Sequence, residues 1–218
     1  MIALWTLIKK EFLIDFRQKY PIAGIVLYIF ATIYLSFLAF QGIITPATWN
    51  ALLWIITLFS FITGLSKSFI GEEKRSLYYY LTVPAELLLS GKLIYYFVYG
   101  LILVALIWIC FQVFMPFPSQ SASIGLFLGN LALGSLGLSS AFTMISSIAS
   151  RTSNSSTLMA VLGFPVIIPV LLLAVTISRK ILLGAKLADI QGSLTYLISV
   201  IVIIIAVSFI LFPYSSRN

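Results

Sequence analysis

The chain has 218 residues, of which 61% are hydrophobic and 9% are charged, and it carries a formal net charge of +7. About 25% of the residues of an average soluble domain are charged, so this chain lacks the polar side chains needed to cover a globular surface. These values exclude a soluble domain and predict an integral membrane protein. In such a protein, excess Lys and Arg indicate cytoplasmic loops and anionic headgroups rather than nucleic acid.

The first twenty residues predict an amphipathic helix that lies in the membrane interface. Apolar residues such as Leu4, Ile8 and Phe12 recur at roughly helical spacing, with charged residues between them. We expect this helix (1–20) to turn at Pro21 into the first span. The alternative is a plain extension of the first span into the cytoplasm. The charges follow and interleave with the apolar residues, and no small-residue cleavage site follows, which argues against a signal peptide.

Six apolar stretches are long enough to span a bilayer, whose hydrocarbon core of ~30 Å needs about 20 residues of helix. The second stretch is near the lower limit, and a continuation through Phe69 and Ile70 would lengthen it. No Asp, Glu, Lys or Arg lies inside any stretch. The sequence therefore predicts an all-α integral membrane protein with one transmembrane domain (1–218) and spans at 22–42, 49–66, 93–114, 124–149, 157–178 and 194–214.

The basic residues predict the orientation of the spans. The connection 179–193 contains three of the thirteen Lys and Arg residues, the connections 43–48 and 115–123 contain none, and the other ten lie on the side of the amino terminus. Because cytoplasmic loops are enriched in Lys and Arg, both termini are expected in the cytoplasm. The cations of 179–193 then lie outside, either in contact with an anionic partner or as solvated loop charges.

The connection 71–92, GEEKRSLYYYLTVPAELLLSGK, is strongly polar for this chain and falls on the cytoplasmic side. Acidic residues in its first turn favour a short helix, and Pro84 suits the first turn of a second one that ends at Ser90 and Gly91. One interpretation is a solvated loop on the membrane surface. The other is a docking surface for a protein, because its tyrosines combine apolar area with hydrogen-bonding groups. The candidate docking residues are Glu72, Glu73, Arg75, Leu77, Tyr80, Pro84 and Glu86.

No motif in the chain predicts catalysis. Histidine is absent and Cys110 is the one cysteine, so the chain's own His and Cys cannot build a zinc, haem or iron–sulfur site, and no metal site is predicted. The sequence contains no HExxH, no GxSxG and no GxxxxGK[ST]. We therefore predict a non-catalytic membrane subunit that cannot hydrolyse ATP through a P-loop of its own.

Two spans contain residues that could serve either packing or transport. The span 124–149 has small residues four apart, first Gly125 and Gly129 and then a Ser and Thr series from 135 to 147, which favours close helix packing over a substrate path. Asn130 is the most polar residue in a span interior and fits either role. In the span 157–178, Pro165 and Pro169 predict a kink or a broken helix, as a pathway wall, a moving element or a static bend.

This order of elements resembles an ABC-2-type exporter permease. More narrowly, the chain resembles the CcmB family, the permease subunit of the haem exporter of cytochrome c maturation. The resemblance runs end to end and rests mainly on residues 69–96 and 151–175. The first stretch has the family's form, with the acidic pair, Ser-Leu, proline and lysine exit at Glu72, Glu73, Ser76, Leu77, Pro84 and Lys92. The second carries the family's closely spaced prolines, Pro165 and Pro169.

The resemblance implies a place in a larger complex in the bacterial inner (plasma) membrane. A separate ABC ATPase subunit would bind ATP and Mg²⁺, and the elbow 71–92 would be the coupling helix that rests on it. A second permease copy, a haem-handling membrane subunit and a periplasmic haem chaperone are the other implied partners. This chain alone is expected to bind no cofactor, and two roles stay open: export of haem as cargo, or ATP-driven release of a haem-loaded chaperone. The alternatives are an ABC-2 permease for another cargo, such as a lipid-linked glycan or a drug, and a membrane assembly scaffold that transports nothing.

Overall fold

The computed structural model describes residues 8–9, 13, 19–41, 44–70, 85–119, 121–149 and 155–216. Six long helices and no strand are found in this part of the chain, and each helix is long and apolar enough to cross a membrane. This confirms the predicted fold class. The helices are α2 (Lys19–Phe40), α3 (Pro46–Ile70), α5 (Ala85–Phe114), α6 (Ile124–Ala149), α7 (Ser155–Leu182) and α8 (Leu187–Ser216).

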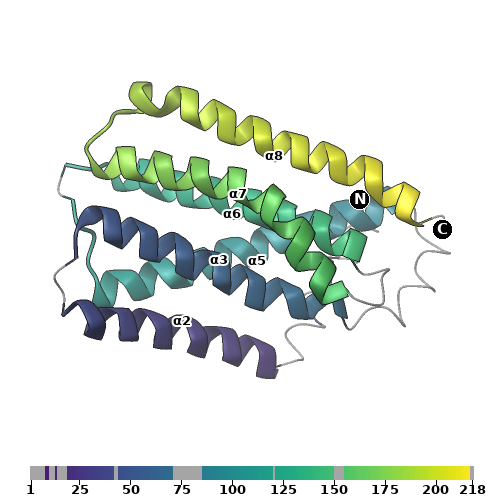
Figure 1. Cartoon of the computed structure of the whole chain (residues 1–218), viewed down its shortest axis with the longest axis horizontal. Coiled ribbons are helices and arrows are strands. Elements are labelled where there is room, and N and C mark those ends of the chain that lie inside the picture. Colours follow the sequence, from purple (N-terminus) through teal and green to yellow (C-terminus); the bar gives the residue numbers. More distant parts are fainter. Residues whose placement is uncertain are drawn as a thin grey trace.

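The helices run alternately up and down, so that their ends form two opposite faces (Figure 1). The short connections after α2, α5 and α7 lie at one face, which we call the short-loop end. The opposite face holds the starts of α2, α5 and α7 and the ends of α3, α6 and α8 (Figure 1). We call it the terminal end because the first long helix, α2, begins there and the last, α8, ends there. In this view α2 and α8 form the two outer edges, and α6 packs against α3, α5, α7 and α8.

The start of α5 differs from the predicted one. The sequence places a short helix before the third span and ends it at Ser90 and Gly91, whereas α5 continues from Ala85 to Phe114 without a break. A glycine inside a helix costs only about 1 kcal/mol, which is less than the packing of a buried turn supplies. Both Gly91 and the neighbouring Leu89 are buried, so tertiary contacts hold this turn in the helix. The second half of the predicted elbow is therefore part of a membrane-spanning helix.

One difference and one agreement concern the first two spans. The chain does not change from one helix to another at Pro21, because Pro21 lies in the first turn of α2, which begins at Lys19. Proline is tolerated in the first turn of a helix, since an N–H there has no role in the intrahelical hydrogen bonds. The second span does continue through Phe69 to Ile70, as the sequence suggests. Only Ile8, Lys9, Leu13 and residues 19–20 of the predicted interfacial helix are described, so that helix stays a prediction.

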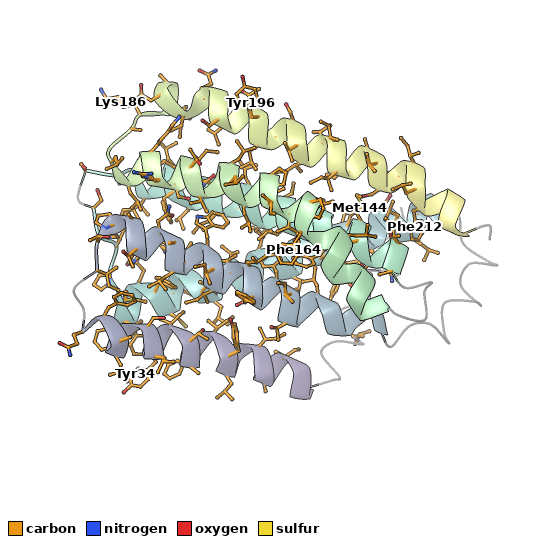
Figure 2. The ribbon with its side chains drawn as sticks, in the orientation of Figure 1. Tyr34, Met144, Phe164, Lys186, Tyr196 and Phe212 are labelled. Carbon is orange, nitrogen blue, oxygen red and sulfur yellow. The ribbon has the colours of Figure 1, made fainter. Side chains whose placement is uncertain are left out.

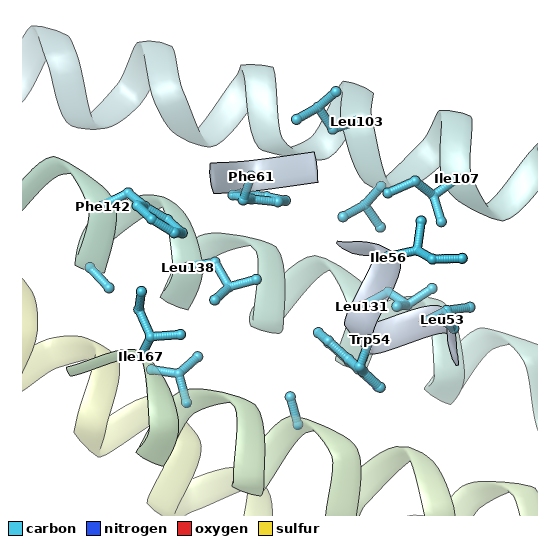
Figure 3. Packing of buried hydrophobic residues seen from close by; sticks show 14 of the residues in the cluster. Leu53, Trp54, Ile56, Phe61, Leu103, Ile107, Leu131, Leu138, Phe142 and Ile167 are labelled. Atoms are coloured by element: carbon cyan, nitrogen blue, oxygen red, sulfur yellow. The ribbon is translucent and has the colours of Figure 1, made fainter. Parts of the chain in front are cut away.

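The interior is formed by apolar side chains from all six helices. Figure 3 shows part of it, with labelled residues from α3, α5, α6 and α7. Phe61 of α3 stacks on Phe142 of α6, with ring centroids 6.5 Å apart, and Leu138 lies beside them. The outer surface is also apolar: Tyr34 and Tyr196 point away from the bundle on α2 and α8 (Figure 2), and 68% of Tyr196 is exposed. Apolar side chains on both the inside and the outside are what a chain surrounded by lipid tails requires.

The connection between α7 and α8 is much shorter than the predicted loop 179–193. Arg179 and Lys180 belong to the last turn of α7, and Asp189 belongs to the first turn of α8. Gly184, with a φ of 87°, ends α7: its N–H donates to Ile181 O (2.9 Å), while the N–H of residue 185 donates to Lys180 O (3.1 Å). These bonds satisfy carbonyl groups that a helix end leaves free.

Asp189 caps the start of α8. Its Oδ2 accepts a hydrogen bond from the backbone N–H of Lys186 (2.9 Å), and its own N–H donates to Lys186 O (3.0 Å). A carboxylate in the first turn also interacts favourably with the positive end of the helix dipole. Asp189 therefore has a structural partner, and Lys180 Nζ likewise donates to Ser193 Oγ (3.2 Å).

Candidate functional site

The predicted docking elbow lies mostly outside the described residues. Glu72, Glu73, Arg75, Leu77, Tyr80 and Pro84 fall in the gap between α3 and α5, and Glu86 is the second residue of α5, with a side chain that is not described. Their docking role therefore stays a prediction. The structure does place the two ends of this segment, Ile70 and Ala85, at the terminal end of the bundle (Figure 1).

Asn130 lies at the centre of a buried polar cluster. Its Nδ2 donates to Ala174 O (2.9 Å) and to Ser178 Oγ (2.7 Å), both on α7. Ser178 Oγ also accepts a hydrogen bond from Trp54 Nε1 of α3 (2.8 Å) and donates to Ala174 O (2.7 Å). The Ser178 hydroxyl thus uses its one donor and both of its acceptor positions. We use the name polar cluster for Asn50, Trp54, Asn130 and Ser178.

Asn50 attaches α3 to the same stretch of α7. Its Nδ2 donates to Val175 O (3.0 Å), one residue beyond the carbonyl that Asn130 contacts. Asn50 and Trp54 are four residues apart and therefore share one face of α3. The polar cluster joins three helices within about two turns of the short-loop end, because Asn50 and Asn130 lie near the starts of α3 and α6 and Ser178 lies near the end of α7.

Among the described residues, two carbonyl oxygens of this cluster have no hydrogen-bond donor. Asn50 Oδ1 and Asn130 Oδ1 are both buried and unpaired, and the two residues are 2% and 1% exposed. Rotating either amide would turn its oxygen toward a backbone carbonyl of α7, so the observed orientation is the better one. The cluster holds no acid or base that could activate the Ser178 hydroxyl, which is bonded to Trp54, Asn130 and a backbone carbonyl. Across the described ranges, no group of three or more His, Cys, Asp and Glu residues could hold a metal ion. What this arrangement can do is fix helices to one another.

An aromatic layer lies beside the polar cluster. Trp49, the neighbour of Asn50 in the chain, donates from Nε1 to Met115 O (2.9 Å), which attaches α3 to the end of α5. Its ring contacts those of four other aromatic residues at centroid distances of 5.3–6.2 Å. These residues are Trp108, Phe111, Phe117 and Phe127. Buried aromatic pairs of this kind contribute about 0.5–1.5 kcal/mol each beyond their buried area.

Only some of the small residues of α6 make the close helix contacts that the sequence predicts. The prediction that Gly125 and Gly129 make a close helix contact is wrong, because no other part of the described structure lies within 4 Å of a Cβ built at either position. Close approaches are instead at Gly134, where an added Cβ would clash with the Trp54 ring and lie 3.4 Å from Ala174 Cβ, and at Gly137, where it would lie 2.6 Å from Val170 Cγ1. Spacing alone could not separate these glycines, since it does not reveal which face of α6 is enclosed.

The Ser and Thr series of α6 is enclosed, as predicted. Ser135, Ser139, Thr143 and Ser147 are all buried. Ser139 Oγ donates to Tyr96 O of α5 (3.0 Å), an interhelical bond of the predicted kind, whereas Thr143 Oγ1 donates to Ser139 O of its own helix (2.7 Å). These contacts and those of Asn130 support helix packing as the role of this face of α6.

The proline pair bends α7 without breaking it. α7 stays helical through Pro165 and Pro169, and its amino-terminal part runs at an angle to the rest (Figure 1). Both prolines are exposed on the outer face of α7, as is the neighbouring Phe164, which is 67% exposed. They therefore do not line the interior of the described bundle. The structure shows the predicted bend in α7, and the roles as a pathway wall or a moving element stay predictions.

A model of a protein family described as CcmB protein matches residues 2–217, nearly the full chain. The chain belongs to the CcmB family. Neither the comparison with curated proteins nor the comparison with solved structures gave a match. The six membrane-spanning helices fit a multi-pass member of the CcmB family.

Sequence reasoning missed three members of the polar cluster in this CcmB-family chain. Asn50, Trp54 and Ser178 lie in predicted spans but were not connected with Asn130. A usable signal was present: when the spans are drawn in alternating directions, Asn50, Asn130 and Ser178 all fall a few residues from the same membrane face. Polar side chains at the same depth in different helices tend to form hydrogen bonds with one another, because lipid tails offer them no donor or acceptor.

Proposed function

We propose that this protein is the transmembrane permease subunit of an ATP-driven ABC complex for haem export or delivery in c-type cytochrome biogenesis. The observation that carries this proposal is the family match over residues 2–217. The six spans and the lack of a P-loop in the sequence support it, because a permease of this kind receives its energy from a separate ATPase subunit.

In this proposal the protein lies in the bacterial inner membrane with both termini in the cytoplasm. Ten of the thirteen Lys and Arg residues then face the cytoplasm, which agrees with the enrichment of basic residues on that side. The terminal end of the bundle is cytoplasmic, and so is the segment that joins Ile70 to Ala85. This segment contains the candidate docking residues Glu72, Glu73, Arg75, Leu77, Tyr80 and Pro84, with Glu86 just beyond it, and it contacts the ATPase subunit.

The other partners follow from the same proposal. A second permease copy completes the membrane part, and a haem-handling membrane subunit supplies haem ligands, because this chain has no histidine. A periplasmic haem chaperone receives the haem. The purified single subunit should accordingly show no stable bis-histidine haem spectrum after incubation with haem. Tight haem binding with such a spectrum would contradict this division of roles.

The docking segment can be tested by charge reversal. We expect Glu72→Lys with Glu73→Lys, or Leu77→Asp alone, to lower co-purification of the ATPase and the ATP turnover of the complex at least tenfold. Membrane insertion should be unchanged, since no span is altered. A matched control reverses two charges at the short-loop end, Arg179→Glu with Lys186→Glu, and should leave both measurements within about twofold. ATPase binding that survives the docking variants would refute the docking role.

A further inference from the structure

Three basic residues lie close together where α7 ends and α8 begins. Arg179 and Lys180 are in the last turn of α7, and Lys186 directly precedes α8. The N–H of residue 185 donates to Lys180 O (3.1 Å), so the backbone of Lys186 lies beside the last turn of α7. The other two connections at the short-loop end, 43–48 and 115–123, contain no Lys or Arg. Positive charge at this end is therefore concentrated at the α7–α8 edge, where Figure 2 shows Lys186.

Two of these cations have no anionic partner among the described residues. Lys180 Nζ donates to Ser193 Oγ of α8 (3.2 Å), whereas the exposed side chains of Arg179 and Lys186 form no hydrogen bond or ion pair within the described part of the chain. Asp189 is the one acidic residue of the sequence after Glu86. Its Oδ2 accepts from the backbone N–H of Lys186 rather than from an ammonium group. Arg179 and Lys186 are thus available to an anion from outside the chain.

The stability of the two helices explains only part of this charge. A cation in the last turn interacts favourably with the helix dipole, so Arg179 and Lys180 suit the end of α7. Lys186 stands before the first turn of α8, where the dipole favours a carboxylate such as Asp189 and disfavours a cation. The carbonyl groups of residues 179–181 already accept hydrogen bonds from the N–H groups of residues 183–185. Lys186 therefore adds positive charge that neither helix needs.

An exposed stripe of α7 leads from the membrane interior to Arg179. Ile168 and Leu172 are 45% and 62% exposed, and Thr176 is exposed one turn further on. Residues at this spacing share one face of a helix. At 1.5 Å per residue, Arg179 lies about 16 Å along the helix from Ile168, which is about half of a hydrocarbon core of ~30 Å. The stripe thus has the length of one lipid leaflet and ends in a cation.

From this arrangement we propose that α7 and the start of α8 bind an anionic phospholipid at the short-loop end. The Arg179 guanidinium and the Lys186 ammonium hold the phosphate of the headgroup, and one acyl chain lies along Leu172 and Ile168. An anionic phospholipid supplies the missing negative charge and an apolar chain in one molecule, whereas a soluble anion supplies only the charge. This inference requires that the six helices cross a membrane and does not depend on the proposed function.

The test measures lipid association at two positions inside the short-loop end. Cys110 is replaced by Ser, and one cysteine is introduced by Leu172→Cys on α7 or by Leu35→Cys on α2, where the native side chains are 62% and 67% exposed. The full-length chain is labelled with a bimane fluorophore and placed in lipid nanodiscs. Phosphatidylglycerol or phosphatidylcholine with a doxyl quencher on its acyl chain is added at the same mole fraction. The ratio of the two quenching constants gives the preference for the anionic lipid at each position.

We expect phosphatidylglycerol to be preferred at least threefold at position 172 and less than about 1.5-fold at position 35, because the connection after α2 carries no charge. Equal preferences at the two positions would overturn the lipid site. Inorganic phosphate in large excess should leave the preference at position 172 unchanged, compared with sodium chloride of the same ionic strength. A preference that phosphate alone abolishes would show a site for a free anion and would also overturn the proposal.

Two pairs of variants test the cations themselves. Arg179→Gln with Lys186→Gln should lower the preference at position 172 to the value at position 35, whereas Arg179→Lys with Lys186→Arg keeps both charges and should retain at least half of it. Both side chains are exposed, so quenching at position 35 should be the same in all chains, which verifies that each variant is folded. A preference that survives in the neutral pair, or that both pairs lose equally, would contradict the proposed headgroup contacts.

Discussion

The beginning and the middle of α6 carry similar small residues in opposite surroundings. At Gly125 and Gly129 no other part of the described chain lies within 4 Å of an added Cβ, whereas at Gly134 the Trp54 ring occupies that space. Asn130 lies between these two regions in sequence but belongs to the enclosed face. A four-residue spacing of small residues therefore defines a face of a helix, and the positions of the neighbouring helices decide whether that face makes close contacts.

The largest effect is expected when an enclosed glycine and an open glycine of α6 are each replaced by leucine. Gly134→Leu forces a side chain into the space of Trp54 and Ala174, so we expect a loss of at least about 3 kcal/mol in the free energy of unfolding. Gly129→Leu adds the same atoms on the open side of α6, so it should not lower stability and can raise it by up to about 1 kcal/mol through helix propensity. Thermal unfolding of both variants in detergent checks the pair. Equal losses would mean that Gly129 is enclosed by a contact outside this chain.

The polar cluster gives a second contrast, between interhelical and local hydrogen bonds. Asn130→Ala removes two bonds to α7 at about 0.6 kcal/mol each and leaves a small void, for an expected loss of about 1–2 kcal/mol. The control is Thr176→Ala, at a similar depth of α7, where the exposed hydroxyl bonds only to Leu172 O of its own helix. Urea or thermal unfolding should show little change for the control. An undiminished stability of Asn130→Ala would contradict the role assigned to the cluster.

The smallest effect is expected at the short-loop end. Gly184 has a φ of 87°, so Gly184→Ala places a side chain in the left-handed region and should cost about 1 kcal/mol. Gly192 lies inside α8, and no other part of the described chain lies within 4 Å of a Cβ built at this position. Gly192→Ala should therefore raise stability by up to about 1 kcal/mol through helix propensity. Opposite signs of the two shifts in melting temperature would support this reading. A loss of stability in both would show that α8 needs the open space at Gly192.

Much of the fold was predictable because it follows from local properties of the chain. The number of spans depends on the length and apolar character of single stretches, and all six were found. The helix boundaries were less accurate at Ser90 and Gly91, where burial of Leu89 outweighs the weak helix preference of glycine. The length of the last connection was also overestimated, because Asp189 caps α8 rather than lying in a loop.

The candidate site was harder to predict because it is made by contacts between helices. Asn130 was found as a candidate from its polarity alone, but its partner Ser178 is an ordinary residue in sequence and gains its role from Trp54 and Ala174. The outward position of Pro165 and Pro169 likewise depends on which face of α7 meets α6, and periodicity did not decide that. The docking residues from Glu72 to Pro84 lie outside the described part of the chain and stay a prediction from sequence.

The central position of α6 also has a consequence for how the protein is made. α3 and α6 are the least apolar of the six helices and are also the two most enclosed by their neighbours. A helix with a weak preference for lipid is retained in the bilayer more easily when another helix already offers partners for its polar groups. During synthesis α6 would therefore depend on α3 and α5, which precede it, and the bonds of Asn130 would form only after α7 has entered the membrane. Assembly of this bundle is thus expected to finish with the α7–α8 pair.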